Sequence, residues 1–305
     1  MSVLEYCVIM ILRSTIPPLD DSAMCCVRQR GGVFERQMFR VGSRILDLLL
    51  PPHCACCGSE TQTAGLFCSD CFSTLQAIGS PSCRRCGTAF ASSSFGGRKG
   101  ICAACEATPP PWDEARAAYV YDEQSRRLIL SLKYSDRTEN ASVLARAMAR
   151  AGHDMLLRAD IVAPVPLHRS RLWRRRYNQA ALIAAALRQS RDFTLLPDLL
   201  ERTRRTPKLA RLNQAERLRV MSAVVAVRSR YASRVRGARI VLVDDVLTTG
   251  ATLGACASAL RSAGAASIDV LVAARTAAPA NEGWETPPFP GLYDEGAQAV
   301  TGGRD

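Results

Sequence analysis

Apolar positions follow two different periods through the second half of the chain. Apolar side chains spaced three or four residues apart predict amphipathic helices, and short runs rich in Val, Ile and Leu predict buried strands. The helical spacing occurs at residues 124–134, 142–152, 177–189 and 252–263, and the strand pattern at residues 160–165, 223–227, 239–243 and 267–272. Because strands and helices alternate, we expect an α/β domain around a central parallel sheet.

The remaining segments divide the chain into five parts. Residues 1–37 have no sustained period, and residues 39–50 predict a short helix that ends before two prolines. We hypothesise that translation starts at Met38 and that residues 1–37 are an untranslated leader. Three prolines predict an extended linker at residues 108–112, between a cysteine-rich segment at residues 38–107 and the α/β domain at residues 113–277. The composition of residues 278–305 predicts a disordered tail.

Eight of the 13 cysteines form four pairs with two residues between the members of each pair. This spacing lets two thiolates bind one tetrahedral Zn²⁺, and a glycine after the second cysteine, as at Gly58 and Gly87, lets the chain turn. The pairs occur in two quartets, which predicts two structural zinc sites in a double zinc ribbon. The predicted ligands are Cys54, Cys57, Cys68 and Cys71 in the first site and Cys83, Cys86, Cys102 and Cys105 in the second.

Other interpretations of the cysteines remain open from the sequence. The first quartet has 10 residues between its pairs and the second has 15, so one zinc beside a degenerate half-site is an alternative. A redox dithiol and an iron–sulfur cluster are further alternatives. Cys56 lies inside the first pair, and Cys256 lies on a predicted helix, where a small buried residue is expected.

Charge is concentrated in one region of a chain whose formal net charge is +12. Residues 167–239 contain 19 Lys and Arg but only 4 Asp and Glu, which indicates either a polyanionic partner or well-solvated surfaces. No apolar stretch has the length of a membrane span, and the N-terminal residues do not fit a signal peptide. We therefore expect a cytoplasmic protein without disulfides.

A phosphate-binding loop is predicted after the strand at residues 239–243. Asp244 and Asp245 follow this strand, and the predicted helix begins near residue 252. The free N–H groups at a helix start bind anions, and threonine hydroxyls add neutral donors. Two carboxylates beside a phosphate suit neutral or cationic groups, such as ribose hydroxyls or Mg²⁺, although they could instead only cap the helix. The predicted loop residues are Thr248, Thr249, Gly250, Ala251 and Thr252.

The sequence Val-Leu-Val-Asp-Asp-Val-Leu-Thr-Thr-Gly-Ala-Thr at residues 241–252 resembles the phosphoribosyl pyrophosphate motif of type I phosphoribosyltransferases. Together with the paired cysteines and Pro-Val-Pro-Leu-His-Arg at residues 164–169, it makes the chain similar to the ComF family over about residues 45–276. The sequences Asn-Gln-Ala at 178–180 and Ala-Arg-Thr at 274–276 also match the family pattern. The resemblance implies a type I phosphoribosyltransferase fold with a central parallel sheet, preceded by a small zinc-ribbon domain.

The resemblance also implies roles for residues outside the motif. Val165, Pro166, Leu167, His168 and Arg169 would form the turn that binds pyrophosphate, with added charge from Arg171. A mobile hood at residues 206–219 would bring Arg211 or Arg217 over the ligand. The chain departs from the family where it has Arg176-Tyr177, Leu209 and Val220, which leaves the acceptor substrate undefined, and Thr248 replaces an acid found in base-salvage relatives.

Two functions follow from these features. The first is a Mg²⁺-dependent phosphoribosyltransferase, a pentosyl-transferring glycosyltransferase, that uses phosphoribosyl pyrophosphate and is linked by the family resemblance to DNA uptake in competence. The second is a non-catalytic module that retains the sugar-phosphate pocket for regulation or for handling single-stranded DNA. The arginine-rich segment would bind the nucleic-acid backbone, and competence-machinery proteins are possible partners.

Overall fold

The computed structural model describes residues 52–61, 63, 65–96, 99–134, 137–167, 177–188, 193–202 and 225–276. Several predictions lie outside these residues: the leader at 1–37, the helix at 39–50, the hood at 206–219 and the tail at 278–305. His168, Arg169, Arg171, Arg211 and Arg217 lie outside them too.

Five parallel strands form the central sheet, in the order β1-β7-β6-β2-β3. The neighbours β2 and β6 pair from Ile161 opposite Ile240 to Pro164 opposite Val243, which sets their carboxyl ends at the same edge. Parallel strands buried on both faces need apolar side chains at successive positions, and β6 and β7 supply them. The strands are β1 (Glu114–Val120), β2 (Ile161–Pro164), β3 (Thr194–Leu195), β6 (Arg239–Leu247) and β7 (Ser267–Arg275).

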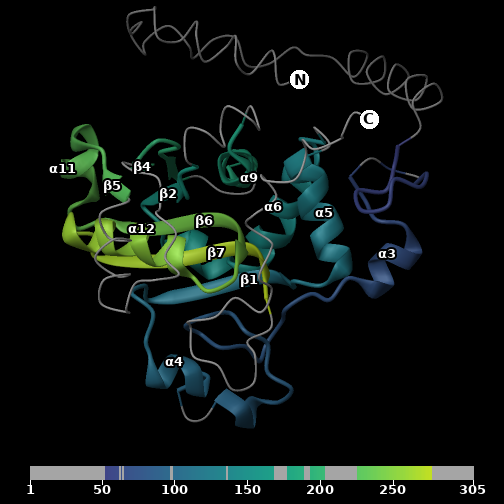
Figure 1. Ribbon diagram of the computed structural model, residues 1–305, viewed down its shortest axis with the longest axis horizontal. Helices are drawn as coiled ribbons and strands as arrows, with labels where there is room; N and C mark the ends of the chain where they lie inside the picture. Colours follow the sequence, from purple (N-terminus) through teal and green to yellow (C-terminus); the bar gives the residue numbers. More distant parts are fainter. Residues whose placement is uncertain are drawn as a thin grey trace, which may run out of the picture. The chain divides into compact units, whose positions relative to one another are not determined.

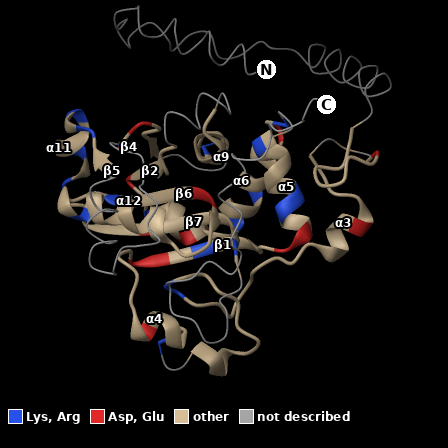
Figure 2. Cartoon of the chain, in the orientation of Figure 1, with Lys and Arg blue, Asp and Glu red and all other residues tan. Residues whose placement is uncertain are grey.

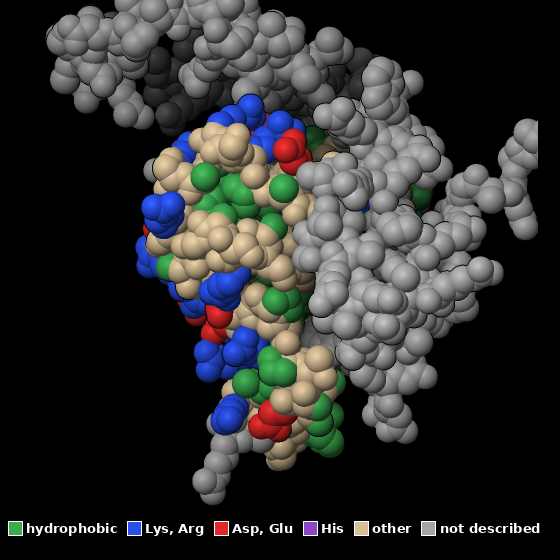
Figure 3. Space-filling model, turned by 60° about the vertical axis from the view of Figure 1, so that its left-hand side comes forward, with side chains coloured by type: hydrophobic (Ala, Val, Ile, Leu, Met, Phe, Trp, Pro, Cys, Tyr) green, Lys and Arg blue, Asp and Glu red, His purple; other side chains and the backbone are tan. Residues whose placement is uncertain are grey.

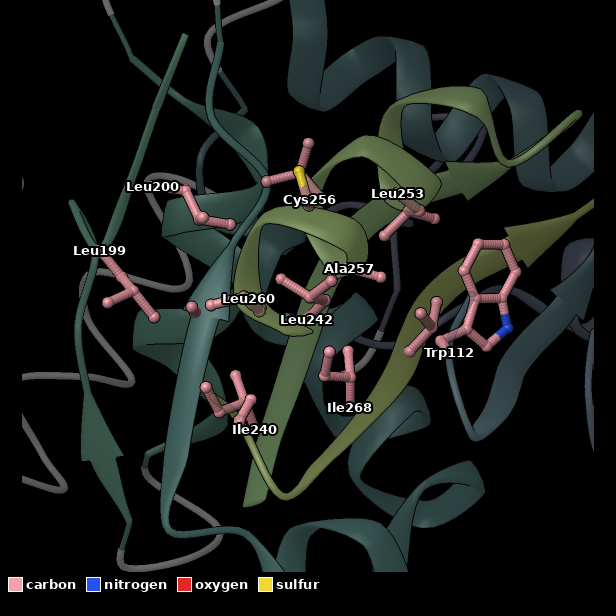
Figure 4. Close-up of a cluster of buried hydrophobic side chains, with 14 of the residues drawn as sticks. Trp112, Leu199, Leu200, Ile240, Leu242, Leu253, Cys256, Ala257, Leu260 and Ile268 are labelled. Carbon is pink, nitrogen blue, oxygen red and sulfur yellow. The ribbon is translucent and has the colours of Figure 1, made fainter. Parts of the chain in front are cut away.

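Alternate side chains of β6 enter two different cores. Ile240 and Leu242 pack with residues of α12 (Ala251–Ser262), as Figure 4 shows for Leu253, Cys256 and Leu260. Val241 and Val243 instead belong to the cluster formed with the helices of the other face. The sheet is thus the middle of three layers (Figure 1). The helices of that other face are α5 (Glu123–Tyr134), α6 (Asn140–Ala151), α7 (His153–Arg158) and α9 (Gln179–Leu187).

A small antiparallel sheet lies on the same side as α12. It consists of β4 (Leu200–Arg202) and β5 (Val225–Val227), and Leu200 and Val225 join the core that contains α12. A short 3-10 helix, η4 (Ser229–Tyr231), and α11 (Ala232–Val235) then lead back to β6. Residues 203–224, which connect β4 to β5, are not described.

The cysteine-rich segment contains short elements: α3 (Ser69–Thr74), α4 (Ala103–Ala107) and the 3-10 helix η2 (Ser93–Gly96). Residues 76–78 run along the free edge of β1, where Ile78 N donates to Ala118 O at 2.9 Å and Val120 N donates to Gln76 O at 2.9 Å. This segment therefore covers an edge strand that would otherwise expose unpaired backbone groups.

The four helices predicted within the α/β domain and the parallel sheet are confirmed, but several boundaries differ. The strand predicted at 239–243 continues to Leu247, so Asp244 and Asp245 lie within β6 rather than after it. β7 is likewise three residues longer than predicted, and the sequence reasoning missed β1 and α7. The strand predicted at 223–227 is β5 from Val225 onward, and it pairs antiparallel outside the main sheet. Among the described helices, none has both the length and the apolar character that crossing a bilayer requires.

Candidate functional site

The eight paired cysteines come together as two groups of four. Within each group the Sγ atoms lie within 4.8 Å of one another. The distance between Cys57 Sγ and Cys68 Sγ is 3.7 Å, and the distance between Cys86 Sγ and Cys102 Sγ is also 3.7 Å. Four thiolates at ~2.3 Å from one Zn²⁺ form a tetrahedron with edges of about 3.8 Å. The donor type and spacing of both groups therefore fit a structural zinc.

The two sites repeat the same local contacts. Cys68 N donates to Cys54 Sγ at 3.3 Å in the first site, and Cys102 N donates to Cys83 Sγ at 3.3 Å in the second. Gly58 and Gly87 have φ angles of 79° and 72°, a conformation that only glycine adopts easily. The glycine prediction is thus confirmed. Such N–H···S bonds hold thiolate ligands in place.

Cys56 and Cys256 do not join these groups. The Cys56 Sγ donates to the Gln124 side-chain oxygen at 3.4 Å, which connects the first site to α5. Cys256 is fully buried on α12, as predicted for a small core residue (Figure 4).

A second cluster of polar residues lies at the carboxyl edge of the sheet. Asp244 and Asp245 lie in the carboxyl-terminal half of β6, after its apolar run, and Figure 2 marks acidic positions on this strand. The Lys133 Nζ on α5 forms a salt bridge of 2.8 Å with Asp245 Oδ2, and both side chains are largely buried. In open parallel α/β sheets, ligands bind at this edge.

The environment of Asp244 favours its neutral form. Burial, reinforced by the negative charge of Asp245, raises the pKa of the Asp244 carboxyl to about 7. The Asp245 backbone N–H, which donates to Asp244 Oδ1 at 2.9 Å, and the charges of Lys133 and Arg202 act in the opposite direction. Asp244 thus lies where little water stabilises its charge, and a cation or hydrogen-bond donor would favour its ionised form.

The predicted phosphate loop connects β6 to α12. Gly250 has a φ of 76° and precedes the first residue of the helix, Ala251, so the loop turns sharply where the helix N-terminus begins. No side chain caps this helix start, although Ala251 N lies 3.4 Å from Thr249 Oγ1. A helix start of this kind offers N–H groups and a positive dipole end to an anion.

The turn after β2 lies beside the same edge. Val165 N donates to Val243 O at 2.9 Å, so Val165, Pro166 and Leu167 leave the sheet next to Asp244. Asn178 fixes this turn, because its Nδ2 donates to Val165 O at 2.9 Å while its Oδ1 accepts from Ala180 N at the start of α9.

Lys133 is the site residue that the sequence reasoning missed. It lies in the last turn of α5, far from β6 in the sequence, and only the fold brings it to Asp245. Tyr177 helps to set its position, because the Tyr177 hydroxyl donates to Leu132 O at 2.7 Å. The one available signal was a lysine at the end of an otherwise apolar helix face.

Two family models match the chain. A double zinc ribbon domain matches residues 45–106, and a phosphoribosyl transferase domain matches residues 208–285. Together with the parallel sheet and the two four-cysteine groups, these matches define a double zinc ribbon followed by a type I phosphoribosyltransferase fold.

The chain belongs to the ComF family. It is 33% identical over 181 residues to the DNA utilization protein YhgH of Escherichia coli strain K12, an alignment that covers 57% of this chain and 78% of that protein. It is 29% identical over 218 residues to competence protein F of Haemophilus influenzae, which covers 68% of this chain and 90% of that protein.

Solved structures resemble the chain less closely. An allosteric regulatory enzyme of purine biosynthesis is 22% identical with a TM-score of 0.30, and the match covers 43% of this chain and 25% of that one. A hypoxanthine phosphoribosyltransferase from Staphylococcus aureus is 14% identical with a TM-score of 0.29, covering 48% of this chain and 77% of that one.

Proposed function

We propose that the carboxyl edge of β2 and β6 binds phosphoribosyl pyrophosphate together with Mg²⁺. The observation that carries this proposal is the pair Asp244 and Asp245, largely buried beside a threonine-rich loop at the start of a helix. An anion loop alone would suit many phosphates, but adjacent carboxylates also require a hydroxyl-bearing or cationic partner. A ribose 5-phosphate unit offers a phosphate for the loop and hydroxyl groups for the carboxylates in one ligand.

In this proposal each part of the ligand meets a different segment. Asp244 and Asp245 accept hydrogen bonds from the ribose hydroxyls. The pyrophosphate binds the turn at Val165, Pro166 and Leu167, which continues into His168 and Arg169, and Arg211 or Arg217 reaches it from the hood. The 5-phosphate binds the hydroxyl and N–H groups of Thr248, Thr249, Gly250, Ala251 and Thr252.

The reaction that we propose transfers the phosphoribosyl group to a nitrogen nucleophile and releases pyrophosphate. Bound Mg²⁺ would neutralise charge on the pyrophosphate, and carboxylate oxygens are ligands that it prefers. Positive charge would develop on the ribose at C1′, so the two aspartates would hold the sugar while the arginines stabilise the leaving group.

We further propose that this activity serves DNA uptake in the cytoplasm. The names of the relatives, DNA utilization protein and competence protein F, support a DNA-related role. A cytoplasmic location is consistent with eight thiols arranged for zinc rather than for disulfides.

Calorimetric titration tests the ligand. Wild-type protein is titrated with phosphoribosyl pyrophosphate in the presence and absence of Mg²⁺, and so is the double variant Asp244→Asn, Asp245→Asn. We expect Mg²⁺-dependent binding by the wild type and a loss of at least about a hundredfold in affinity for the double variant, since two charge-assisted hydrogen bonds are weakened. No binding by folded, zinc-loaded wild type would refute the proposal.

Binding of single-stranded DNA is a second candidate function. It is favoured by the basic residues around α11, where Arg230, Arg234 and Arg236 occur within seven positions, and Figure 3 shows Lys and Arg side chains over one face of the described residues. If phosphate contacts dominate, the affinity for an oligonucleotide falls steeply with salt. Binding that survives in the double aspartate variant would separate this surface from the sugar-phosphate site.

A further inference from the structure

Arg275, the last residue of β7, connects the second four-cysteine site to the phosphate loop. Its side chain is 6% exposed. The Nε donates to Cys86 O at 3.2 Å, and the Nη1 donates to Leu247 O at 3.1 Å and to Thr248 O at 2.9 Å. One guanidinium therefore joins the backbone of a zinc-ligand residue to the backbone that opens the phosphate loop.

The turn that contains Cys86 is docked on the phosphoribosyltransferase fold by three consecutive carbonyls. Arg84 O accepts from Ala115 N at 2.8 Å, and Arg85 O accepts from the Trp112 indole N–H at 2.7 Å. Cys86 O accepts from Arg275. A turn held at three successive peptide units cannot shift without breaking bonds to β1, to the buried Trp112 or to Arg275.

The contacts of Arg275 also orient the loop. In a trans peptide unit the C=O and the N–H point in opposite directions. Because Arg275 binds the carbonyls of Leu247 and Thr248, the N–H groups of Thr248 and Thr249 point away from it. Arg275 thus selects the peptide orientation that leaves these two N–H groups directed away from the second zinc site.

We propose that Arg275 is a positioning residue through which zinc at the second four-cysteine site sets the phosphate loop. Zinc holds Cys86 through its Sγ, Cys86 O holds Arg275, and Arg275 holds the loop carbonyls. Loss of zinc or of the guanidinium fork releases the loop and weakens binding of a phosphorylated ligand. The statement about affinity rests on the proposed function, whereas the statement about loop order does not.

The first four-cysteine site provides a built-in contrast. Its contacts lead to α5 and α6: Asn140 Nδ2 donates to Ala55 O at 2.9 Å, Arg146 Nη2 donates to Gly65 O at 2.6 Å, and Cys56 Sγ reaches Gln124. None of these three contacts involves the phosphate loop. Zinc at the first site is therefore expected to stabilise the fold without setting the loop.

Amide hydrogen exchange on the full chain, without ligand, tests the coupling. In Arg275→Lys a single ammonium replaces the fork and cannot reach both Cys86 O and the loop carbonyls. We expect exchange to accelerate on the order of tenfold at the amides that bond to the loop, Gly254 N–H on Gly250 O at 2.7 Å and Thr276 N–H on Leu247 O at 3.2 Å, with the middle of β6 and β7 unchanged. The matched control is Arg146→Lys, which loses an arginine contact between a ribbon and the fold but leaves the loop untouched. Equal protection of the loop in Arg275→Lys and wild type would overturn the proposal.

Two cysteine variants distinguish the roles of the two zinc sites. Cys86→Ser and Cys57→Ser remove the corresponding ligand from the second and first sites, and zinc content is measured for each. We expect the loop to lose protection in Cys86→Ser but not in Cys57→Ser. Similar loop protection in both variants would contradict the proposal, and this comparison decides the matter if Arg275→Lys fails to fold.

Titration with phosphoribosyl pyrophosphate and Mg²⁺ then measures the effect on affinity. We expect the dissociation constant of Arg275→Lys to rise on the order of tenfold while that of Arg146→Lys stays within twofold. If wild type does not bind this ligand, the proposed function fails, but the exchange experiment still confirms or overturns the role of Arg275. If wild type binds and Arg275→Lys binds equally well, the role of Arg275 fails and the proposed function stands.

Discussion

The charge of Asp244 depends strongly on its surroundings. Its pKa, raised to about 7 by burial and by Asp245, lies above the value of about 3.9 for an exposed aspartate. The folded protein therefore retains a proton that the unfolded chain releases. The stability contributed by this group is complete below about pH 4 and is lost as the pH rises through about 7.

Asp244→Asn tests this sign, because asparagine is neutral at every pH. We expect the variant to gain stability relative to the wild type as the pH rises from about 5 to about 8. Urea unfolding of both proteins at the two pH values, without Mg²⁺ or ligand, gives the comparison. Two stability profiles that run parallel would show that Asp244 does not titrate in this range.

Lys133 compensates the same pair of carboxylates. Lys133→Met keeps the aliphatic length but removes the ammonium that lies 2.8 Å from Asp245 Oδ2. We expect a loss of about 1–3 kcal/mol in the free energy of unfolding near pH 8, less than for a fully buried pair, since both partners keep some exposure. Lys133→Arg should recover most of this loss. Equal unfolding midpoints for wild type and Lys133→Met would contradict the assignment.

At the scale of elements, periodicity predicted the helices with regular apolar spacing and missed or shortened strands whose sequence is less regular. The helices at α5, α6, α9 and α12 carry regular apolar spacing and were found. β6 was predicted too short because its carboxyl end carries Asp244 and Asp245, which read as loop residues but continue the pairing with β7. β1 was missed because its three alanines, Glu114 and Arg116 leave no run rich in Val, Ile and Leu.

The glycine that follows Cys86 in the second four-cysteine site allows a prediction at this scale. Gly87 has a φ of 72°, and an added Cβ would lie 3.3 Å from the backbone N of Ala117 on β1. Gly87→Ala should therefore cost more than the roughly 1–2 kcal/mol of left-handed strain alone and should lower the zinc content. Thermal unfolding and metal analysis measure the two effects.

Two other glycines distinguish backbone strain from crowding against β1. Gly237 has a φ of 74°, and an added Cβ would meet nothing within 4 Å, so Gly237→Ala reports the strain without crowding. Gly79 has neither feature, and Gly79→Ala should be neutral or slightly stabilising. If Gly87→Ala and Gly237→Ala were equally destabilised, close packing of the turn on β1 would play no part.

For the whole molecule, the sequence predicted the classes of site better than the connections between them. The cysteine spacing predicted both four-cysteine groups, and the 241–252 motif predicted a strand that turns at Gly250 into a helix. Lys133 and the bonds of Arg275 could not be predicted, because they join residues that are distant in sequence and no local pattern records them. Trp112, at the end of the predicted linker, is buried in the core beside Ile268 (Figure 4).

These connections predict that the phosphoribosyltransferase fold needs the zinc-ribbon segment. A fragment of residues 108–305 loses the acceptor of the Trp112 indole N–H, the Cys86 carbonyl that accepts from Arg275 and the residues that cover the edge of β1. At about 1 kcal/mol for each lost hydrogen bond, with a further penalty for each buried group left unpaired, the loss approaches the 5–15 kcal/mol that stabilises a typical domain.

We therefore expect the 108–305 fragment to unfold or aggregate, driven also by the uncovered strand edge. The comparison is a fragment of residues 52–305, which retains every contact described above. Size-exclusion chromatography and circular dichroism distinguish the outcomes, and thermal scans of the longer fragment with and without a zinc chelator add a second measure. If the 108–305 fragment is a folded monomer with the same melting temperature as the longer fragment, the ribbons only attach to a fold that is stable without them. If its melting temperature is lower, or if it forms no folded monomer, the zinc sites and the sheet stabilise one cooperative structure.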